Sequence, residues 1–347
     1  MDERKRLILQ AIVQDYIATA EPVGSRTVAR RYLSQFSAAT IRNEMADLEE
    51  MGMLAQPHTS AGRIPSEKGY RYYVDNLLHN PVLAKTELTA LRNEFASGIQ
   101  AMDDIIQQTS SLLGSLTQYM ALVSGPSQQQ SMFHRIQLVE IGSGQAIAVL
   151  VTDSGYVVKR MIQVPKDADQ QWLNQVSDYL SQNLRGVPVQ QLALGGLIHL
   201  RHDIMGRFHN FTQIVDLVLA LLHDATLERM HLGSPAQILT LPEFQDLNRM
   251  RGLLSLIEEG EHLQSLFEFG NERHNKVHIR IGSENALREV DNLSLVSAAY
   301  GLRGKKLGYL AVLGPTRMDY ARTVAIVREL SALLNEALAR NDKETHS

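Results

Sequence analysis

Three short helical patterns separated by chain breakers occupy the first eighty residues, and this spacing restricts the fold more than any other feature. Apolar residues recur at helical intervals from Leu7 to Ile17, and the pattern stops at Glu21-Pro22. A second helix is expected over Ser25 to Tyr32, because Gly24 breaks the chain and Ser25 can cap the next turn. A turn at Ser34 to Phe36 leads to the third pattern. This order predicts a helix-turn-helix domain.

The third pattern runs from about Ala38 to Met51, with Ser37 as its N-cap and Gly52 placed to end it in a left-handed conformation. Its apolar stripe is formed by Ile41, Met45 and Leu48. The opposite face carries Ala39, Arg42, Asn43 and Ala46, with Thr40 at its edge. Arginine can pair with guanine, asparagine with adenine, and threonine or alanine with the thymine methyl group. We therefore expect a recognition helix, and a surface helix with merely solvated charges is the alternative.

A hairpin is expected after this helix, because Leu54 to Pro65 is rich in turn-forming residues. We call this hairpin the wing. Hydroxyl groups, backbone amides and cations at its tip suit phosphate contact or insertion into the minor groove. The candidates are His58, Thr59, Ser60, Gly62 and Arg63, and Lys68 and Arg71 could extend the contact. An ordinary surface loop is the alternative.

Charges in this region are segregated along the chain. No acidic residue lies between Glu21 and Glu44, whereas Arg26, Arg30, Arg31 and Arg42 all do. The net charge of -4 belongs to the whole chain, and DNA binding needs only one cationic face. We therefore add Arg26 to the candidate DNA contacts.

Several classes of protein are excluded or disfavoured by the residues and motifs that the sequence lacks. No cysteine is present, so disulfides, cysteine-bound metals and thiol nucleophiles are excluded, and a cytoplasmic location is expected. No apolar stretch approaches the about 20 residues of a membrane-spanning helix, and no signal peptide is expected. His199, His202 and His209 match no zinc pattern, and neither a P-loop nor a GxSxG sequence appears. We expect no enzyme, no cofactor and no metal. The alternative that ranks last is a hydrolase or metal enzyme that uses these histidines.

The rest of the chain predicts an α+β domain with an insertion. Apolar residues from Leu88 to Met120 follow helical spacing, which predicts one long helix that packs either on a sheet or on a dimer mate. A short linker is expected over Ser124 to Ser131. Strands are expected in one mostly antiparallel sheet, followed by a closing helix over Arg317 to Ala339. The strand segments are Ile136 to Ile141, Ala146 to Val151, Tyr156 to Val164, Val277 to Ile281, Leu293 to Tyr300 and Lys306 to Leu313.

This order suits a GAF-like layer, and it yields a multi-domain α+β fold class. The predicted domains are a winged helix-turn-helix over 1–80, a GAF-like domain over 81–165 and 271–342, a helix-rich insert over 166–270, and a polar tail over 343–347. The insert is apolar around Phe208, Phe211 and Ile214 to Leu222. Such helices need either a homodimer mate or a core of their own.

Two dense motifs resemble the family of heat-inducible transcription repressors, HrcA. The first is SAATIRNEMADLEEMG (Ser37 to Gly52), followed by PHTSAGRIPSEKGYRYYVDNLL (Pro57 to Leu78); the second is GKKLGYLAVLGPTRMDYAR (Gly304 to Arg322). Thr40, Arg42 and Asn43 match the family's recognition helix. The wing is matched by His58, Thr59, Ser60, Gly62 and Arg63. Ser66 stands where many relatives have threonine, which keeps the hydroxyl group.

The resemblance implies a dimeric repressor that binds double-stranded DNA at an inverted-repeat operator upstream of chaperonin and other heat-shock chaperone operons. It also implies that a chaperonin modulates the repressor by assisting its active fold, and that the dimerising domain is inserted into the GAF-like domain. A different possibility keeps the winged helix but makes the GAF-like domain a receptor for a small-molecule effector, and the sequence names no such ligand.

Overall fold

The computed structural model describes the following parts of the chain: 1–58, 61–78, 82–96, 102–125, 131–142, 144–153, 156–165, 168–193, 211–226, 230–234, 237, 241–245, 250–252, 254–255, 276–285, 290, 293–302 and 305–345. Contacts divide it into two compact units. The first comprises Met1–Gly98, Gln107–Val123 and Met230–Ser347, and the second comprises Ile99–Ile106 and Ser124–Arg229. Thr59, Ser60, His199, His202, His209 and Phe208 lie outside the described residues.

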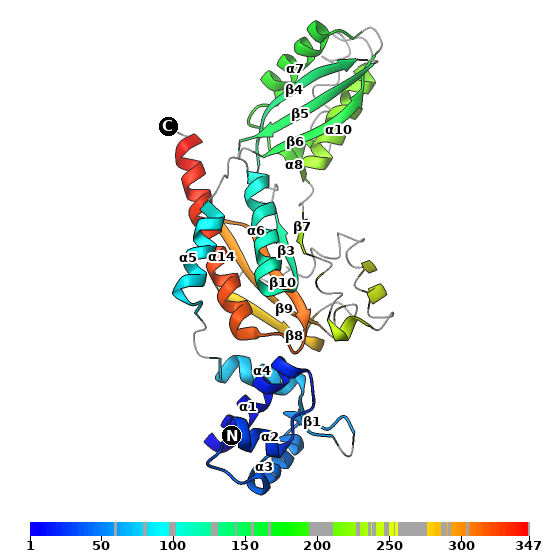
Figure 1. Ribbon diagram of the computed structural model, residues 1–347. Coiled ribbons are helices and arrows are strands. Elements are labelled where there is room, and N and C mark those ends of the chain that lie inside the picture. The colour runs from blue at the N-terminus through cyan, green and yellow to red at the C-terminus, as the bar shows by residue number, and fades with distance from the viewer. Residues whose placement is uncertain are drawn as a thin grey trace. The chain divides into compact units, whose positions relative to one another are not determined.

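The first unit begins with the N-terminal module, which we define as residues 1–78 (Figure 1). Its elements are α1 (Glu3–Thr19), α2 (Ser25–Arg31), α3 (Ala38–Glu50), β1 (Leu54–Ala55), β2 (Ile64–Pro65) and α4 (Glu67–Asn76). The predicted helices and hairpin are confirmed. Ser37 caps α3 as expected, and Gly52 has a φ of 71°. The prediction that Ser25 caps α2 is wrong, because Gly24 is the N-cap and Ser25 is buried inside the helix.

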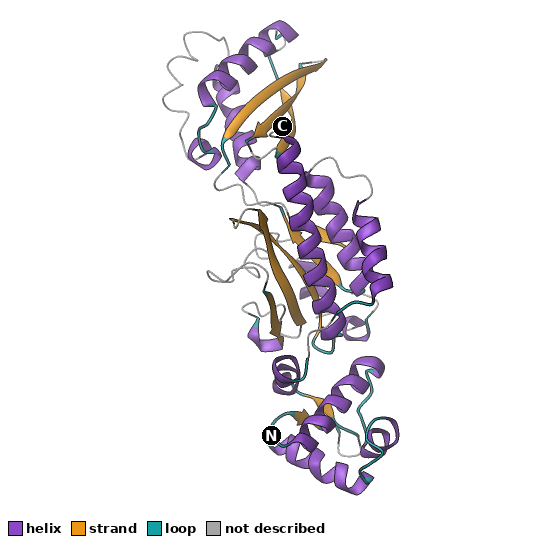
Figure 2. Ribbon diagram, turned by 90° about the vertical axis from the view of Figure 1, so that its left-hand side faces the viewer, coloured by secondary structure: helices purple, strands orange, loops and turns teal. Residues whose placement is uncertain are grey.

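A five-stranded sheet forms the rest of the first unit, in the order β7-β3-β10-β9-β8. The strands are β3 (Met120–Ser124), β7 (Met230–Gly233), β8 (Val277–Ile281), β9 (Leu293–Leu302) and β10 (Lys305–Pro315). β10 pairs antiparallel with both β3 and β9. Figure 2 shows the long C-terminal helix α14 (Tyr320–Thr345) and neighbouring helices on one face of this sheet. Two short 3-10 helices, η3 (Pro242–Gln245) and η4 (Gly282–Glu284), also belong to this unit.

The second unit contains a separate three-stranded antiparallel sheet in the order β4-β5-β6. Its strands are β4 (Phe133–Gly142), β5 (Gln145–Thr152) and β6 (Val157–Gln163). The helices α7 (Gln170–Leu184), α8 (Val189–Gln191) and α10 (Phe211–Thr226) share one hydrophobic core with the sheet. Val218, Leu221 and Leu222 of α10 lie in this core. These three side chains therefore pack within their own unit. This agrees with the alternative in which the apolar helices of the insert form a core of their own.

Three features of the predicted architecture are wrong. The strands β4 to β6 do not share a sheet with β8 to β10, because the two sets belong to different sheets and different units. Met120 is not helical but begins β3, which pairs with the central strand β10. β7, which lies inside the predicted insert, joins the five-stranded sheet of the first unit.

The long helix predicted from Leu88 is described as two helices, α5 (Lys85–Ala96) and α6 (Met102–Thr117), and residues 97–101 between them are outside the described part. In the part of the chain that the structure describes, no helix has the length and apolar character needed to span a membrane.

Candidate nucleic-acid interface

The helix α3 presents one apolar and one polar face. Ile41 and Leu48 are fully buried in the core of the N-terminal module, and Met45 is nearly so. Ser37 Oγ accepts a hydrogen bond from the Thr40 amide at 3.0 Å and lies 2.9 Å from the Thr40 hydroxyl, which fixes the first turn. The exposed residues on the other face are Ala39, Arg42, Asn43 and Ala46, with Thr40 half-buried at its edge. The predicted recognition face is thus available to an external partner.

Carboxylates in the second half of α3 are paired with cations from α1. Lys5 Nζ lies 2.7 Å from Glu44 and 2.9 Å from Asp47, and Arg4 Nη1 lies 3.1 Å from Glu44. Hydrogen bonding to Glu44 and Asp47 raises the pKa of the Lys5 ammonium group. Because these charges are compensated within the module, they repel a polyanion less than free carboxylates would.

Three exposed arginines in α2 and α3 are free of ion pairs with the described residues: Arg26, Arg30 and Arg42. Arg31 differs, because its guanidinium lies 3.0 Å from Asp15, which also accepts a hydrogen bond from the Tyr32 hydroxyl. α2 and α3 pack against each other, so their free cations belong to one small domain. The segregation of charge in the sequence therefore corresponds to cations that remain available for contact.

The wing is anchored to the module by Gly62 and Arg63. The Val23 amide donates to the Arg63 carbonyl, and the Arg63 amide donates to the Val23 carbonyl, both at 2.9 Å. The Arg63 guanidinium binds Glu49 through Nε at 2.9 Å and Nη2 at 2.7 Å. A side chain at Gly62 would collide with the backbone carbonyl of Val23. These contacts give both residues a structural role beside the predicted contact with DNA.

Gly62→Ala should therefore destabilise the wing, because the added methyl group meets backbone atoms that cannot rotate away. We expect a loss of about 1–3 kcal/mol in the free energy of unfolding, the usual cost of overpacking. Denaturant titration of the full chain checks this, with Ala61→Ser at the neighbouring half-buried position as a control. An unchanged midpoint for Gly62→Ala would contradict the close approach.

Lys68 and Arg71 bind groups of the protein itself. Lys68 Nζ donates to the Met51 carbonyl at 2.8 Å, which satisfies the C-terminal end of α3. Arg71 donates through Nε to Glu284 at 2.8 Å and lies 3.2 Å from Asp75. The geometry thus favours a structural role over DNA contact for these two cations. His58 is exposed at the wing, next to residues outside the described part.

Residues that organise this surface but were not predicted from the sequence include Arg4, Lys5 and Glu284. Arg4 and Lys5 bind α3 residues about forty positions later, and Glu284 binds Arg71 across 213 positions. Local spacing carries no signal for such pairs. In the described residues, no group of histidines and carboxylates could hold a metal ion.

Comparison with known proteins agrees with the two motifs of the sequence. Residues 103–324 match the family model described as the HrcA protein C-terminal domain. The heat-inducible transcription repressor HrcA of Pelotomaculum thermopropionicum is 41% identical over 98% of this chain and 97% of its own length. The corresponding protein of Desulforamulus reducens is 42% identical over 98% of each chain.

A solved structure supports the fold. The crystal structure of a hypothetical protein superimposes with a TM-score of 0.72 at 23% sequence identity, over 98% of this chain and 99% of the other. Family model and relatives together cover the N-terminal module as well as the sheets. The chain therefore belongs to the family of heat-inducible transcription repressors, HrcA.

Proposed function

We propose that this repressor binds an inverted-repeat operator of heat-shock chaperone operons as a homodimer, placing one α3 helix in the major groove of each half-site. The observation that carries this proposal is the exposed face of α3. Arg42 lies there without an ion pair, and Asn43 without a side-chain hydrogen bond, to any described residue. Three of the four carboxylates of the same helix are paired with Arg4, Lys5 or Arg63, namely Glu44, Asp47 and Glu49. Bound in this way, the dimer would block transcription sterically.

The proposed DNA contacts fall into two classes. Ala39, Thr40, Arg42 and Asn43 are assigned to base edges, because they project from the first half of a helix that can enter the groove. Phosphate contacts position a protein without selecting sequence. They are assigned to Arg26 on α2 and to the wing residues His58, Thr59, Ser60 and the Gly62 backbone, since the Arg63 backbone and guanidinium already bind Val23 and Glu49.

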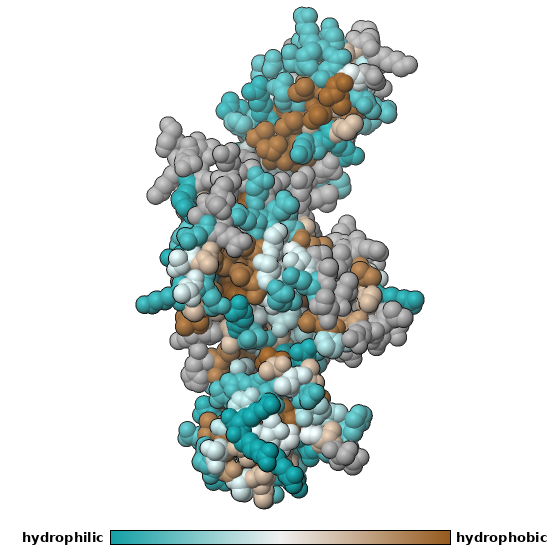
Figure 3. All heavy atoms as spheres, in the orientation of Figure 1, coloured by the Kyte–Doolittle hydropathy of each residue, from teal (hydrophilic) through white to brown (hydrophobic). Residues whose placement is uncertain are grey.

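The proposed dimer surface is the outer face of the β4-β5-β6 sheet. Helices pack on the inner face, whereas the outer face carries Val139, Ile147 and Met161 in one row across the three strands. Val139 is 43% exposed and Met161 63% exposed. Figure 3 shows hydrophobic side chains of this unit as a brown band over the strands. Contiguous exposed apolar patches are typical of protein interfaces, so we assign this face to a second copy of the chain.

We also propose that a chaperonin modulates the active fold, as the resemblance to the family suggests. Refolding the heated protein with and without added chaperonin, followed by titration with operator DNA, measures the fraction of competent repressor. No change in that fraction at any chaperonin concentration would remove this part of the proposal.

Binding to an inverted-repeat duplex and to a scrambled duplex tests the proposed function directly. Both are measured at one near-physiological salt concentration, because electrostatic affinity alone imitates specificity at low salt. We expect a preference of at least about a thousandfold for the repeat. Equal weak binding to both duplexes, with and without chaperonin, would contradict the proposal.

Arg42→Ala should weaken binding to the operator by about 1–3 kcal/mol for each half-site and relax the base preference at one position of each half-site. The reason is that the variant loses a bidentate contact with a base edge. The substitution leaves no described group of the protein unpaired, because the exposed Arg42 guanidinium binds none of them. Titration of the operator and of single-base variants measures both effects.

Arg30→Ala is the matched control, since Arg30 is also free of ion pairs with described residues but lies on α2. We expect a smaller loss that is uniform across sequences. If Arg42→Ala weakened operator and random DNA by the same factor, the assignment to a base edge would be wrong.

A further inference from the structure

Helix α4 is fixed on one side to the end of the recognition helix. Ser66 Oγ donates to the Gly52 carbonyl at 2.6 Å, and the Ser66 amide donates to the Met53 carbonyl at 3.1 Å. Lys68 Nζ adds its bond to the Met51 carbonyl at 2.8 Å. The three carbonyls directly after α3 are therefore held by the first turn of α4. A displacement of α4 must also displace the end of α3.

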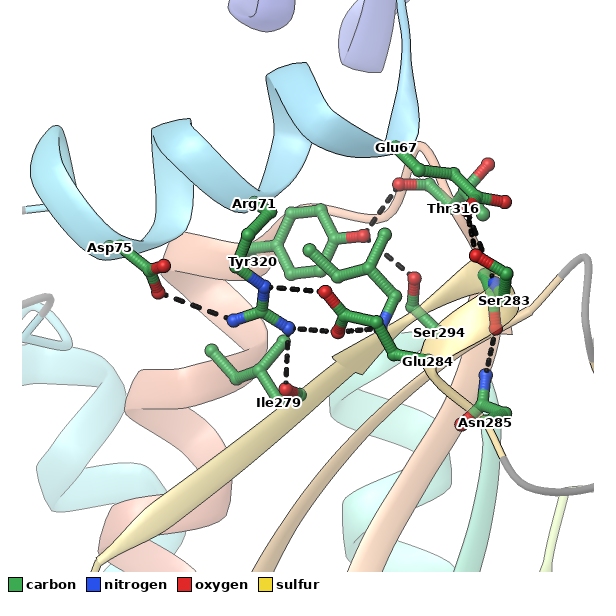
Figure 4. A network of polar contacts seen from close by, with 12 residues as sticks. Glu67, Arg71, Asp75, Ile279, Ser283, Glu284, Asn285, Ser294, Thr316 and Tyr320 are labelled. Atoms are coloured by element: carbon green, nitrogen blue, oxygen red, sulfur yellow. Dashed lines mark hydrogen bonds and ion pairs between the residues drawn. The ribbon is translucent and has the colours of Figure 1, made fainter.

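The same helix is fixed on its other side to the turn after β8, as Figure 4 shows. Arg71 donates to both carboxylate oxygens of Glu284 and to the Ile279 carbonyl, the latter at 2.7 Å. Glu67 accepts hydrogen bonds from the Ser283 amide at 3.2 Å and from its hydroxyl at 2.5 Å. We call this set of contacts between Glu67, Arg71, Ser283 and Glu284 the α4 latch.

The turn that receives α4 is held rigidly by its own contacts. Glu284 accepts a further hydrogen bond from the Ile281 amide at 2.8 Å. The buried Asn285 amide group donates to the carbonyls of Gly282, Val290 and Leu293 at 3.0, 3.1 and 2.7 Å. Gly282 has a φ of 55°, and a side chain there would collide with the Glu67 carboxylate. The left-handed glycine thus permits the close approach of α4.

A second point of attachment lies beside the latch. The Tyr70 ring of α4 packs against Tyr320 of α14 with ring centroids 5.8 Å apart. The Tyr70 hydroxyl is buried without a hydrogen-bond partner among the described residues, and burial raises its pKa. Arg317, which binds Glu243, also donates to the Ile17 carbonyl of α1 at 3.4 Å. Polar and aromatic contacts therefore join the N-terminal module to the five-stranded sheet at two places.

We propose that Arg71 and Glu284 are positioning residues that fix the direction in which α3 is presented, so that a dimer accepts only one spacing between its half-sites. This inference rests on the proposed function. A dimer whose reading helices are held rigidly matches one separation of major grooves. Once the latch is broken, each module keeps only the Tyr70 and Arg317 contacts to the rest of its unit, so its direction is less restricted. The effective concentration at the second half-site then falls, and other spacings are tolerated.

The test uses the full-length chain with Arg71→Ala and Glu284→Ala. Each variant is titrated with a single half-site, with the inverted repeat, and with repeats whose spacer is lengthened by about 5 base pairs, half a helical turn. We expect half-site affinity within about twofold of the wild type, repeat affinity lowered about tenfold, and at least a tenfold loss of preference for the original spacer. Glu284→Gln, which keeps an acceptor for Arg71, should retain more of the preference.

Glu87→Ala is the matched control, because Glu87 forms an exposed ion pair with Arg322 at 2.8 Å that does not involve α4. It should leave all three affinities unchanged. An unaltered spacer preference in both latch variants would overturn the proposal. An equal loss of affinity for the half-site and the repeat would also overturn it. If only Arg71→Ala shows this loss, Arg71 contacts DNA; if both variants show it, the module is misfolded. A wild type that does not prefer the repeat would instead refute the proposed function itself.

Discussion

Met161→Glu should convert the repressor to a monomer and lower operator affinity at least about a hundredfold. The change places a charge in the centre of the proposed dimer surface, where an unpaired carboxylate costs several kcal/mol to bury. Met161 is 63% exposed within its own chain, so the fold of the unit should tolerate the substitution. Sedimentation velocity gives the oligomeric state, and titration with the inverted repeat gives the affinity.

Gln175→Glu provides the control for Met161→Glu, because it adds the same charge at an exposed position of α7 in the same unit. We expect this variant to remain dimeric and to bind the operator like the wild type. Far-UV circular dichroism spectra of both variants should coincide below their melting temperatures, because the secondary structure of each chain is kept. A dimeric Met161→Glu protein would show that the second copy does not bind the outer face of the β4-β5-β6 sheet.

The side chains of β5 alternate between the two faces of this sheet, and both faces receive apolar residues. Ala146, Ala148 and Leu150 of β5 point into the core, whereas Ile147 and Val149 point outward, and both sets are apolar. A sheet that needs to cover only one face places polar residues on the other. Apolar residues on both faces therefore indicate a second covering layer, which the helices of the unit provide on one side only.

The N-terminal module was predictable because its signals are local. Caps, breakers and the apolar stripe of α3 all lie within a few residues of the structure that they determine, and Ser37 and Gly52 do as their positions predict. The exception at Ser25 is also local. Either Gly24 or Ser25 could stand at the start of α2, and burial of the serine places the cap one residue earlier.

The pairing of strands could not be predicted in the same way. Neither length nor composition separates β4 to β6 from β8 to β10 as two sets, and alternation identifies a strand without identifying its neighbours. Met120 continues the apolar spacing of α6, although the helix itself ends at Thr117. The sequence pattern therefore does not show that β3 begins at Met120. β7 is only four residues long and offers almost no periodicity. Membership of a sheet is decided by contacts between distant segments.

The sequence also does not predict which cations of the N-terminal module bind other residues of the protein and which remain exposed. Arg42 and Arg71 are both arginines near a predicted DNA-binding helix, and only their partners separate them. Arg71 binds a carboxylate 213 residues away, and this hydrogen bond raises the pKa of its guanidinium. Arg42 binds no described residue and remains free for an external anion. The sequence predicted a cationic region, and the geometry divides it into cations that bind the protein itself and cations that are free of described partners.

Leu48→Ala should lower the temperature at which the repressor releases its operator. Leu48 is fully buried beneath the recognition face, and truncation of a buried leucine costs about 2–5 kcal/mol because a cavity remains. For a domain of this size each kcal/mol lowers the melting temperature by roughly 4–8 °C, so a loss of at least about 8 °C is expected. Leu48→Met, which conserves volume, should cost less than about 1.5 kcal/mol.

Circular dichroism melts measure the melting temperature of each variant, and operator binding against temperature measures the temperature of release. If operator release in Leu48→Ala kept the wild-type temperature while the module melted earlier, the two events would be independent, and repression would not depend on the packing that presents α3.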